Sequence, residues 1–231
     1  MPLSTDPYDR RRRRVLTLAH RYDCEPTHSR HVTLLALSLF DQLQQLHNLG
    51  RAERELLEYA GLLHDIGYHI SPKGHNKHSY ELIVSADLPE FQWHEVRIIA
   101  AVARYHRKRQ PKPRDKELLG LDASQRHTVS VLAGILRVAD GLDRTHQSVV
   151  TSVRARIGTN RVDIVAHVSG NADAELWHGR RKSDLLEHAL QKRVTIKALV
   201  PANAGSVMEQ LESGANTCRV CGTICKSKLE G

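Results

Sequence analysis

YAGLLHDIGYHISPKGHNKHSYELI, at residues 59–83, contains an adjacent histidine and aspartate, His64 and Asp65. His64 continues the apolar row of a predicted helix, and Gly67 is a residue at which that helix can end. The pair therefore points inward at a helix end. An ionised carboxylate on a buried face is costly, or its pKa changes until it is neutral. We therefore expect Asp65 to have a partner elsewhere in the fold.

Three more ionisable residues lie on the apolar faces of predicted helices. His28 lies one turn before an apolar row, and His106 and Asp140 each continue such a row at its end. Periodicity alone also selects His47, and a single inward histidine is more often an ordinary hydrogen-bonded one. The prediction of a shared metal site therefore rests on the joint pattern of histidines and carboxylates on separate helices.

Imidazole nitrogens and carboxylate oxygens are ligands for divalent cations such as Mn, Fe, Co, Ni, Mg or Zn. A mixed ligand set with open positions leaves room for water, so the predicted site could be catalytic. The sequence leaves open which metal binds and whether one ion or two are held.

The spacing of apolar residues predicts an α+β fold, mostly a helical bundle. Prolines and glycines in PKPRDKELLGLD (111–122) indicate a surface loop. The expected helices span residues 9–21, 28–47, 51–66, 76–86, 92–107 and 124–140.

After residue 146 the pattern changes to that of a small ββαβ unit. SVVTSVRARIG (148–158) and RVDIVAHVSG (161–170) alternate, with Thr159 and Asn160 as their turn. A single helix is expected at 172–190 and a strand at 194–200. The predicted organisation is a helical domain at 1–146, an α/β unit at 147–200 and a tail at 201–231.

These motifs together resemble the HD superfamily of metal-dependent phosphohydrolases, which is named for its adjacent His-Asp pair. More closely, the chain is similar over residues 15–200 to the C-terminal HD-type region of the exopolyphosphatase and guanosine pentaphosphate phosphohydrolase family. The stretches that carry this resemblance are HSRHVTLLALSLFDQL (28–43), the segment 59–83, SADLPEF (85–91), ARYHRK (103–108) and RVADGLDR (137–144).

The resemblance implies a ligand set for the metal. Ligands carried over by position are His28, His64, Asp65 and Asp140. Superfamily members with two metals use further histidines, and here His78 and His106 occupy matching places. Either His75 or His78 could face the site. We prefer His78, because the apolar positions Leu82 and Ala86 follow it at four-residue steps. The helical domain is therefore expected to be an HD-type bundle.

Cationic side chains are expected around the metal, because phosphate esters and anhydrides carry several negative charges. Lys73 follows the His-Asp pair, and Arg107 and Arg144 each follow a predicted ligand. Asp65 could both bind metal and orient water. These four residues form the predicted catalytic set, although Lys73 fits a solvated loop charge equally well.

The expected function is that of a metal-dependent phosphohydrolase acting on a phosphorylated anionic small molecule: a nucleotide, an alarmone or a short polyphosphate. Polyphosphatase-type relatives carry a large N-terminal actin-like domain that contains their hydrolytic site. This sequence has no room for that domain, so exopolyphosphatase activity is not inherited from the resemblance. The intact ligand set favours a free-standing enzyme. The alternative is a non-catalytic basic module that binds nucleotide, polyphosphate or nucleic acid.

The net charge of +8 over 231 residues indicates anionic partners. The arginines at 10–14 and the segment 107–116 could neutralise a phosphate backbone, but aromatic residues make up only 4% of the chain. Nucleic-acid binding is therefore without a supporting motif. No apolar run is long enough to cross a membrane, and a cytoplasmic location is expected. The edge of the small sheet leaves a homodimer open.

The four cysteines do not form a disulfide framework. Cys218, Cys221 and Cys225 give one CxxC motif with a third thiol, which is an incomplete zinc site. We interpret this tail as disordered or as non-native sequence.

Overall fold

The computed structural model of the chain describes residues 6–22, 25–107 and 110–199. The predicted tail, with its CxxC motif, lies outside these residues. The described helices before the sheet are α1 (Pro7–Tyr22), α2 (Pro26–Gln42), α3 (Gln44–His47), α4 (Arg51–Leu63), η1 (Ile66–His69), α5 (His75–Val84), α6 (Trp93–Tyr105), η2 (Lys116–Leu118) and α7 (Ala123–Gly141). Five of the six helices expected from the sequence are confirmed within a few residues at their ends, whereas the single helix expected at 28–47 is interrupted at Leu43 and forms α2 and α3. The short 3₁₀ segments η1 and η2 are not revealed by the apolar period.

Local hydrogen bonds fix where the long helices begin. In α7 the carboxylate of Asp122 accepts the N–H of Gln125 at 2.9 Å, while the Gln125 side chain accepts the N–H of Asp122 at 3.0 Å. Glu53 in α4 and Glu95 in α6 likewise accept the N–H of the residue three positions earlier, each at 2.8 Å. These caps satisfy backbone donors that would otherwise have no partner inside the helix.

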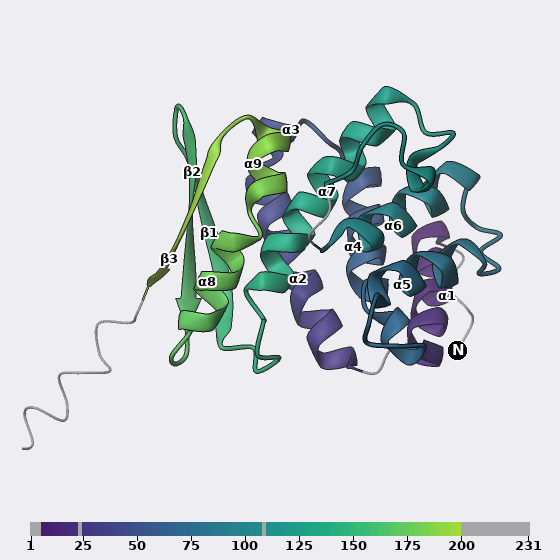
Figure 1. Cartoon of the computed structure of the whole chain (residues 1–231), viewed down its shortest axis with the longest axis horizontal. Coiled ribbons are helices and arrows are strands. Elements are labelled where there is room, and N and C mark those ends of the chain that lie inside the picture. The colour runs from purple at the N-terminus through teal and green to yellow at the C-terminus, as the bar shows by residue number, and fades with distance from the viewer. Residues whose placement is uncertain (1–5, 23–24, 108–109, 200–231) are drawn as a thin grey trace, which may run out of the picture. The chain divides into compact units, whose positions relative to one another are not determined.

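Helix α7 is the centre of the fold. It packs against α2, α4 and α6 on one side and against α8 (Asp173–Arg181) and α9 (Asp184–Leu190) on the other. Its apolar residues from Val129 to Leu136 are completely buried. The C-terminal end of α7 lies between the helices of the bundle and helices α8 and α9 (Figure 1). Side chains from both groups of helices can therefore contact a residue at this end.

The sheet has three strands in the order β1 (Val150–Ile157), β2 (Arg161–Val168) and β3 (Arg193–Leu199). Strands β1 and β2 are antiparallel, and β2 and β3 are parallel. The face that includes Ile164 and Ile196 is buried, and the sheet contacts α2, α8 and α9. The expected α+β fold, mostly helical, is confirmed. Residues up to 199 form one compact unit, and the division into domains after residue 146 stays a prediction.

The single helix expected at 172–190 is wrong, because two helices occupy this segment. Helix α8 ends at Arg181, and α9 begins at Asp184. At the break, the N–H of Lys182 bonds to the carbonyl of His178 at 3.0 Å, and the Ser183 hydroxyl bonds to the carbonyl of Arg180 at 2.9 Å. The hydrophobic period continues across this break, which is why the sequence does not reveal it.

A glycine pair allows α8 to approach the end of α7. A Cβ atom on Gly141 would lie 2.8 Å from both the Cα and the N of Gly179. Such contacts with backbone atoms are too short for any side chain at position 141, so glycine is required there. A Cβ atom on Gly179 would lie 3.0 Å from a side-chain carbon of Leu142. This crossing brings the C-terminal end of α8 next to Asp140.

In the described part of the chain, none of the helices combines the length and hydrophobicity that a membrane span requires. Of the arginines at 10–14, Arg11 bonds to Glu55 and Glu95, Arg12 to Glu58 and Arg14 to Glu90. These guanidinium groups hold α1 against acidic residues of the same chain.

Candidate metal centre

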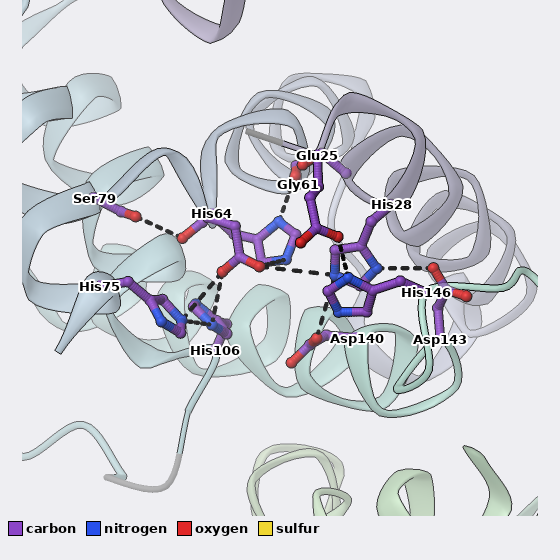
Figure 2. Close-up of polar contacts among 12 residues, drawn as sticks. Glu25, His28, Gly61, His64, His75, Ser79, His106, Asp140, Asp143 and His146 are labelled. Carbon is purple, nitrogen blue, oxygen red and sulfur yellow. Dashed lines mark hydrogen bonds and ion pairs between the residues drawn. The ribbon is translucent and has the colours of Figure 1, made fainter. Parts of the chain in front are cut away.

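Six ionisable side chains from five helical segments meet at one place (Figure 2). Each of them lies at or near the end of its helix, where the backbone is still ordered and the side chain can turn toward the centre. They are His28 in the first turn of α2, His64 and Asp65 after α4, His75 at the start of α5, His106 after α6 and Asp140 in the last turn of α7.

The carboxylate of Asp65 lies at the middle of this group. Its Oδ2 is 3.4 Å from Nε2 of His64 and 3.8 Å from Nε2 of His28. Its Oδ1 is 3.2 Å from Nε2 of His75 and 3.5 Å from Nε2 of His106. His28, His64 and Asp65 thus form one group with the spacing of a metal site, and Asp65, His75 and His106 form a second. The two groups share Asp65.

Three of the imidazoles are oriented by hydrogen bonds at their other ring nitrogen. Nδ1 of His64 lies 2.7 Å from the carbonyl of Gly61, and Nδ1 of His106 lies 2.6 Å from the carbonyl of Ala103. Nδ1 of His28 lies 2.8 Å from Oδ2 of Asp143. A carbonyl oxygen can only accept, so each Nδ1 that faces one carries the hydrogen, and the Nε2 lone pair of the neutral ring then faces Asp65.

Three of the inward-facing atoms lack hydrogen-bond partners. Among the described residues, Nε2 of His28, Nε2 of His64 and Oδ1 of Asp65 are buried without one. Buried polar groups are nearly always satisfied, so such a set is unusual. Imidazole nitrogens and carboxylate oxygens around one place are the donors that a divalent cation of intermediate softness requires. The residues present therefore fit a metal ion.

Each ring nitrogen of His75 lies within hydrogen-bond distance of another group. Its Nδ1 lies 3.2 Å from the carbonyl of Pro72 and 3.4 Å from a guanidinium nitrogen of Arg107. Its Nε2 is 3.3 Å from Nε2 of His106. When Nδ1 donates to Pro72, two neutral lone pairs face each other, an arrangement that a bound cation would stabilise.

The electrostatics of the cluster favour a positive charge at its centre. Burial opposes protonation of His28, but the carboxylates of Asp140 and Asp143 outweigh burial and raise its pKa to about 9. Burial lowers the pKa of His106 to about 3, so its ring is neutral at pH 7 and its lone pair is available. Burial also opposes ionisation of Asp65, yet the neighbouring imidazoles of His64, His75 and His106 hold its pKa well below its usual range. A proton on His28 and a metal ion would therefore compete for the negative potential that the carboxylates create at the centre of the cluster.

Asp140 faces two positive groups. Its Oδ1 is 3.7 Å from Nε2 of His28, and its Oδ2 is in an ion pair with Lys182. Despite burial, the charge of Lys182 and the contact with His28 hold the pKa of Asp140 well below its usual range. Its Oδ1 remains directed toward the cluster.

The preference for His78 is corrected by the structure, which places His75 in the cluster. The buried row of α5 runs through His75, Ser79 and Ile83, whereas His78 is partly exposed and its nearest acidic group is Glu81 at 3.7 Å. Leu82, which supported the choice of His78, is only partly buried. The row from His75 to Ile83 at four-residue steps is the signal that identifies the inward histidine.

Gly67 explains how His75 reaches the site. A Cβ atom on Gly67 would lie 2.0 Å from the carbonyl oxygen of His75, so only glycine permits this approach. The Ser79 hydroxyl donates to the carbonyl of His64 at 2.7 Å and accepts the N–H of Gly67 at 2.9 Å. The sequence suggests that Gly67 ends a helix, but α4 already ends at Leu63 and Gly67 lies inside η1. Its role in the structure is to let α5 pack against the turn that carries His64 and Asp65.

A cavity of about 380 Å³ opens beside the cluster. Asp65, His75, His106 and Asp140 lie on its wall, together with the predicted cations Arg107 and Arg144. Lys73 is exposed and does not line it, because the loop before α5 carries it to the surface. The cavity also contains Arg181 and Lys182 from the end of α8, basic residues that fit a solvated helix face equally well in the sequence and to which the sequence assigns no role.

His146 covers the cluster from the loop after α7. Its ring stacks on that of His28, with centroids 3.8 Å apart and planes 11° apart, and its Nδ1 is in an ion pair with Glu25. Its backbone has a φ of 58°, in the left-handed region that costs a non-glycine residue energy. The stacking, the ion pair and the buried Asp143 of the same loop hold this conformation.

Comparison with known proteins identifies relatives of this chain. Residues 10–191 match the family model described as Ppx/GppA phosphatase, domain III. A guanosine-5'-triphosphate,3'-diphosphate pyrophosphatase of Aeromonas hydrophila is 32% identical over 135 residues, which are 57% of this chain and 26% of the relative. The protein of the same name from Aeromonas salmonicida is 33% identical over 95 residues, which are 41% of this chain and 19% of the relative. The matched region is thus about a quarter or less of either relative's length.

Proposed function

This chain belongs to the Ppx/GppA phosphatase family through its domain III, and on that premise we propose that it is an HD-type, metal-dependent phosphohydrolase. The proposed substrate is a phosphorylated anionic small molecule: a nucleotide, an alarmone or a short polyphosphate. The printed name of the Aeromonas relatives, a pyrophosphatase of guanosine-5'-triphosphate,3'-diphosphate, supports the nucleotide class.

One observation carries this proposal. Nε2 of His28 and Nε2 of His64 are buried and face Oδ2 of Asp65, and Oδ1 of the same carboxylate faces His75 and His106. Among the described residues, the two nitrogens and Oδ1 have no hydrogen-bond partner. Leaving such atoms unsatisfied costs stability, and a metal ion compensates for that cost when it binds. A merely structural cluster would instead pair each donor with an acceptor.

The proposed ligands are divided between two positions. His28, His64, Asp65 and Asp140 would hold one ion, and Asp65, His75 and His106 a second. A divalent ion at such a centre activates water for attack and offsets the charge of the phosphoryl group. Asp65 would hold both ions and orient the attacking water. Arg107 and Arg144 would bind phosphoryl oxygens, because a guanidinium group matches them with two parallel hydrogen bonds.

Metal content and phosphate release together test the proposal. Purified protein is loaded separately with each candidate divalent metal, and bound metal is measured by elemental analysis after desalting. Phosphate release is measured with guanosine nucleotides phosphorylated at one or both ends, with short inorganic polyphosphates and with p-nitrophenyl phosphate. The parent is expected to bind two ions per chain and to release phosphate from at least one of these compounds.

Asp65→Asn is the decisive variant, because one carboxylate serves both positions. It is expected to lose both ions and to slow phosphate release by at least about 100-fold, the upper end of the effect of second-shell changes in metal sites. Asp87→Asn, which makes the same change at an exposed aspartate, is expected to behave like the parent. An Asp65→Asn protein that hydrolyses every active compound at the parental rate would overturn the catalytic assignment. Metal binding without phosphate release from any compound would favour the non-catalytic binding module.

A further inference from the structure

The cavity beside the metal cluster contains more positive than negative side chains. Its wall carries five cationic residues, Arg107, Arg137, Arg144, Arg181 and Lys182, and three carboxylates, Asp65, Asp140 and Asp184. Arg137 pairs with Asp184 at 2.9 Å, and Lys182 pairs with Asp140. Within the described residues, Arg107, Arg144 and Arg181 have no carboxylate partner. Like charges gathered in one cavity repel each other, so this arrangement favours an anion.

Two of these cations are delivered by a specific feature of the fold. The Gly141–Gly179 crossing sets α8 against the end of α7, and α8 then stops at Arg181. Arg181 is the last residue of α8 and Lys182 follows it, and both line the cavity.

Lys182 stands between the metal cluster and the arginines. Its ammonium group is bound to Oδ2 of Asp140, while its side chain keeps 24% of its exposure. An ammonium group has three donors, so two remain for a ligand. Arg181 lies over the ring of Trp177 at 5.1 Å, which restricts its guanidinium group beside the cavity. Burial lowers the pKa of His178, and the charges of Arg144 and Lys182 lower it further, as expected for a positive field at this wall.

We propose that Arg181 and Lys182 form a second anion subsite, which binds a phosphate group of the substrate other than the one that is hydrolysed. This inference rests on the proposed function. The substrate class that it defines carries at least two phosphate groups, either in a chain or at two positions of a nucleotide. A compound with a single phosphate would engage the metal cluster and leave this subsite empty.

Binding in the absence of metal tests the subsite separately from catalysis. Inorganic tripolyphosphate is titrated into the full chain by calorimetry in EDTA, at low ionic strength. The parent is expected to bind it, and the double variant Arg181→Ala/Lys182→Met is expected to bind at least about tenfold more weakly, since charge-assisted hydrogen bonds are lost at both positions. Arg51→Ala/Lys197→Met removes the same charge from exposed positions on α4 and β3, and is expected to bind as the parent does. Equal affinity of the two double variants would overturn the proposal.

Steady-state kinetics of the metal-loaded protein provide a second measurement. They also distinguish whether the subsite accepts the phosphate of an inorganic chain or that of a nucleotide. In Arg181→Ala, which keeps the ion pair between Lys182 and the proposed metal ligand Asp140, KM is expected to rise several-fold for tripolyphosphate and for a guanosine nucleotide phosphorylated at both ends. The KM for p-nitrophenyl phosphate is expected to stay within about twofold. A rise for the inorganic chain alone, or for the nucleotide alone, identifies which source the subsite accepts. The same rise for all three compounds would overturn the subsite.

The failures of the two proposals are distinguishable. Asp65→Asn is expected to retain tripolyphosphate binding in EDTA, because the subsite does not require metal. Tripolyphosphate binding that depends on Arg181 and Lys182, in a protein without hydrolytic activity, would leave the subsite intact and remove the phosphohydrolase. Single Arg181→Ala, an exposed position at a helix end, serves as a second variant if the double variant is poorly folded, with tripolyphosphate binding again expected to weaken. Unchanged binding in this folded single variant would contradict a role for Arg181.

Discussion

Nδ1 of His28 lies 2.8 Å from Oδ2 of Asp143, and this contact joins the first turn of α2 to the loop after α7. The other carboxylate oxygen of Asp143 accepts the N–H of Ser148 at 2.8 Å. Both oxygens of a completely buried aspartate are thus used, one to orient an imidazole and one to hold the loop. The histidine orientation on which the proposed metal centre depends is therefore set by a residue outside the ligand set.

Asp143→Asn is expected to weaken metal binding by about 10–100-fold, the range found when an outer-shell partner of a ligating histidine is changed. An amide has only one acceptor oxygen, so it cannot accept from both His28 and Ser148. Metal affinity is measured by competition with a chromophoric chelator. Asp173→Asn, at an exposed aspartate of α8, is the matched control. Parental affinity in Asp143→Asn would contradict the role of this contact.

His75→Ala and His78→Ala distinguish the two histidines of α5. His75 contacts Asp65 and His106, so its alanine variant is expected to lose one of two metal ions and keep the other. His78 is partly exposed outside the cluster, and His78→Ala is expected to keep both. Elemental analysis of the loaded proteins measures the ratio. Loss of an ion in His78→Ala, with none in His75→Ala, would reverse the assignment.

Gly141→Ala is expected to destabilise the protein and to weaken tripolyphosphate binding together. The added methyl would meet the backbone of Gly179 at 2.8 Å, and overpacking of this kind costs about 1–3 kcal/mol. Alanine regains up to about 1 kcal/mol of helix propensity, so a net loss remains. Urea unfolding and calorimetry measure the two effects. Gly170→Ala is the control, because a Cβ there meets no atom within 4 Å. Equal stability of both variants would mean that α7 and α8 do not need this close approach.

His47 is expected to make stability depend on pH below its unfolded value of 6.5. Burial lowers its pKa in the folded protein and outweighs the hydrogen bond from Nε2–H to the carbonyl of Phe40 at 3.0 Å, which raises it. Nδ1 accepts the N–H of Leu49 at 3.0 Å. The unfolded chain therefore binds more protons below pH 6.5, and stability falls as the pH decreases, by up to about 1.4 kcal/mol per pH unit for one group. Above pH 6.5 the contribution is constant.

The measurement for His47 is urea unfolding at pH 7.5 and pH 5.5 on the parent and on His47→Leu. The variant is less stable at both values but is expected to lose less between them, because it has no titrating group at this position. His20→Gln, at an exposed histidine of α1, is expected to keep the parental difference between the two pH values. An unchanged difference in His47→Leu would remove His47 as its source.

Much of the fold follows from local information in the chain. The three- and four-residue spacing of apolar side chains specifies the helices and which of their faces is buried, and alternation after residue 146 specifies the strands. The same spacing predicts that His28, His64, Asp65 and His106 face inward, and all four are buried in the structure. This works because burial of a helix face or a sheet face depends on the period of one segment alone.

The meeting of separate segments was decided only by the tertiary structure. His75 enters the cluster because Gly67 has no side chain, and Lys182 reaches Asp140 because Gly141 and Gly179 allow two helices to touch. The periodicity of apolar residues carries no information about such contacts. In the sequence, a glycine that permits close approach of two backbones cannot be distinguished from a glycine that ends a helix. The sequence by itself determined which helix and strand faces are buried, and the packing of helix ends determined which side chains meet in one cluster and line one cavity.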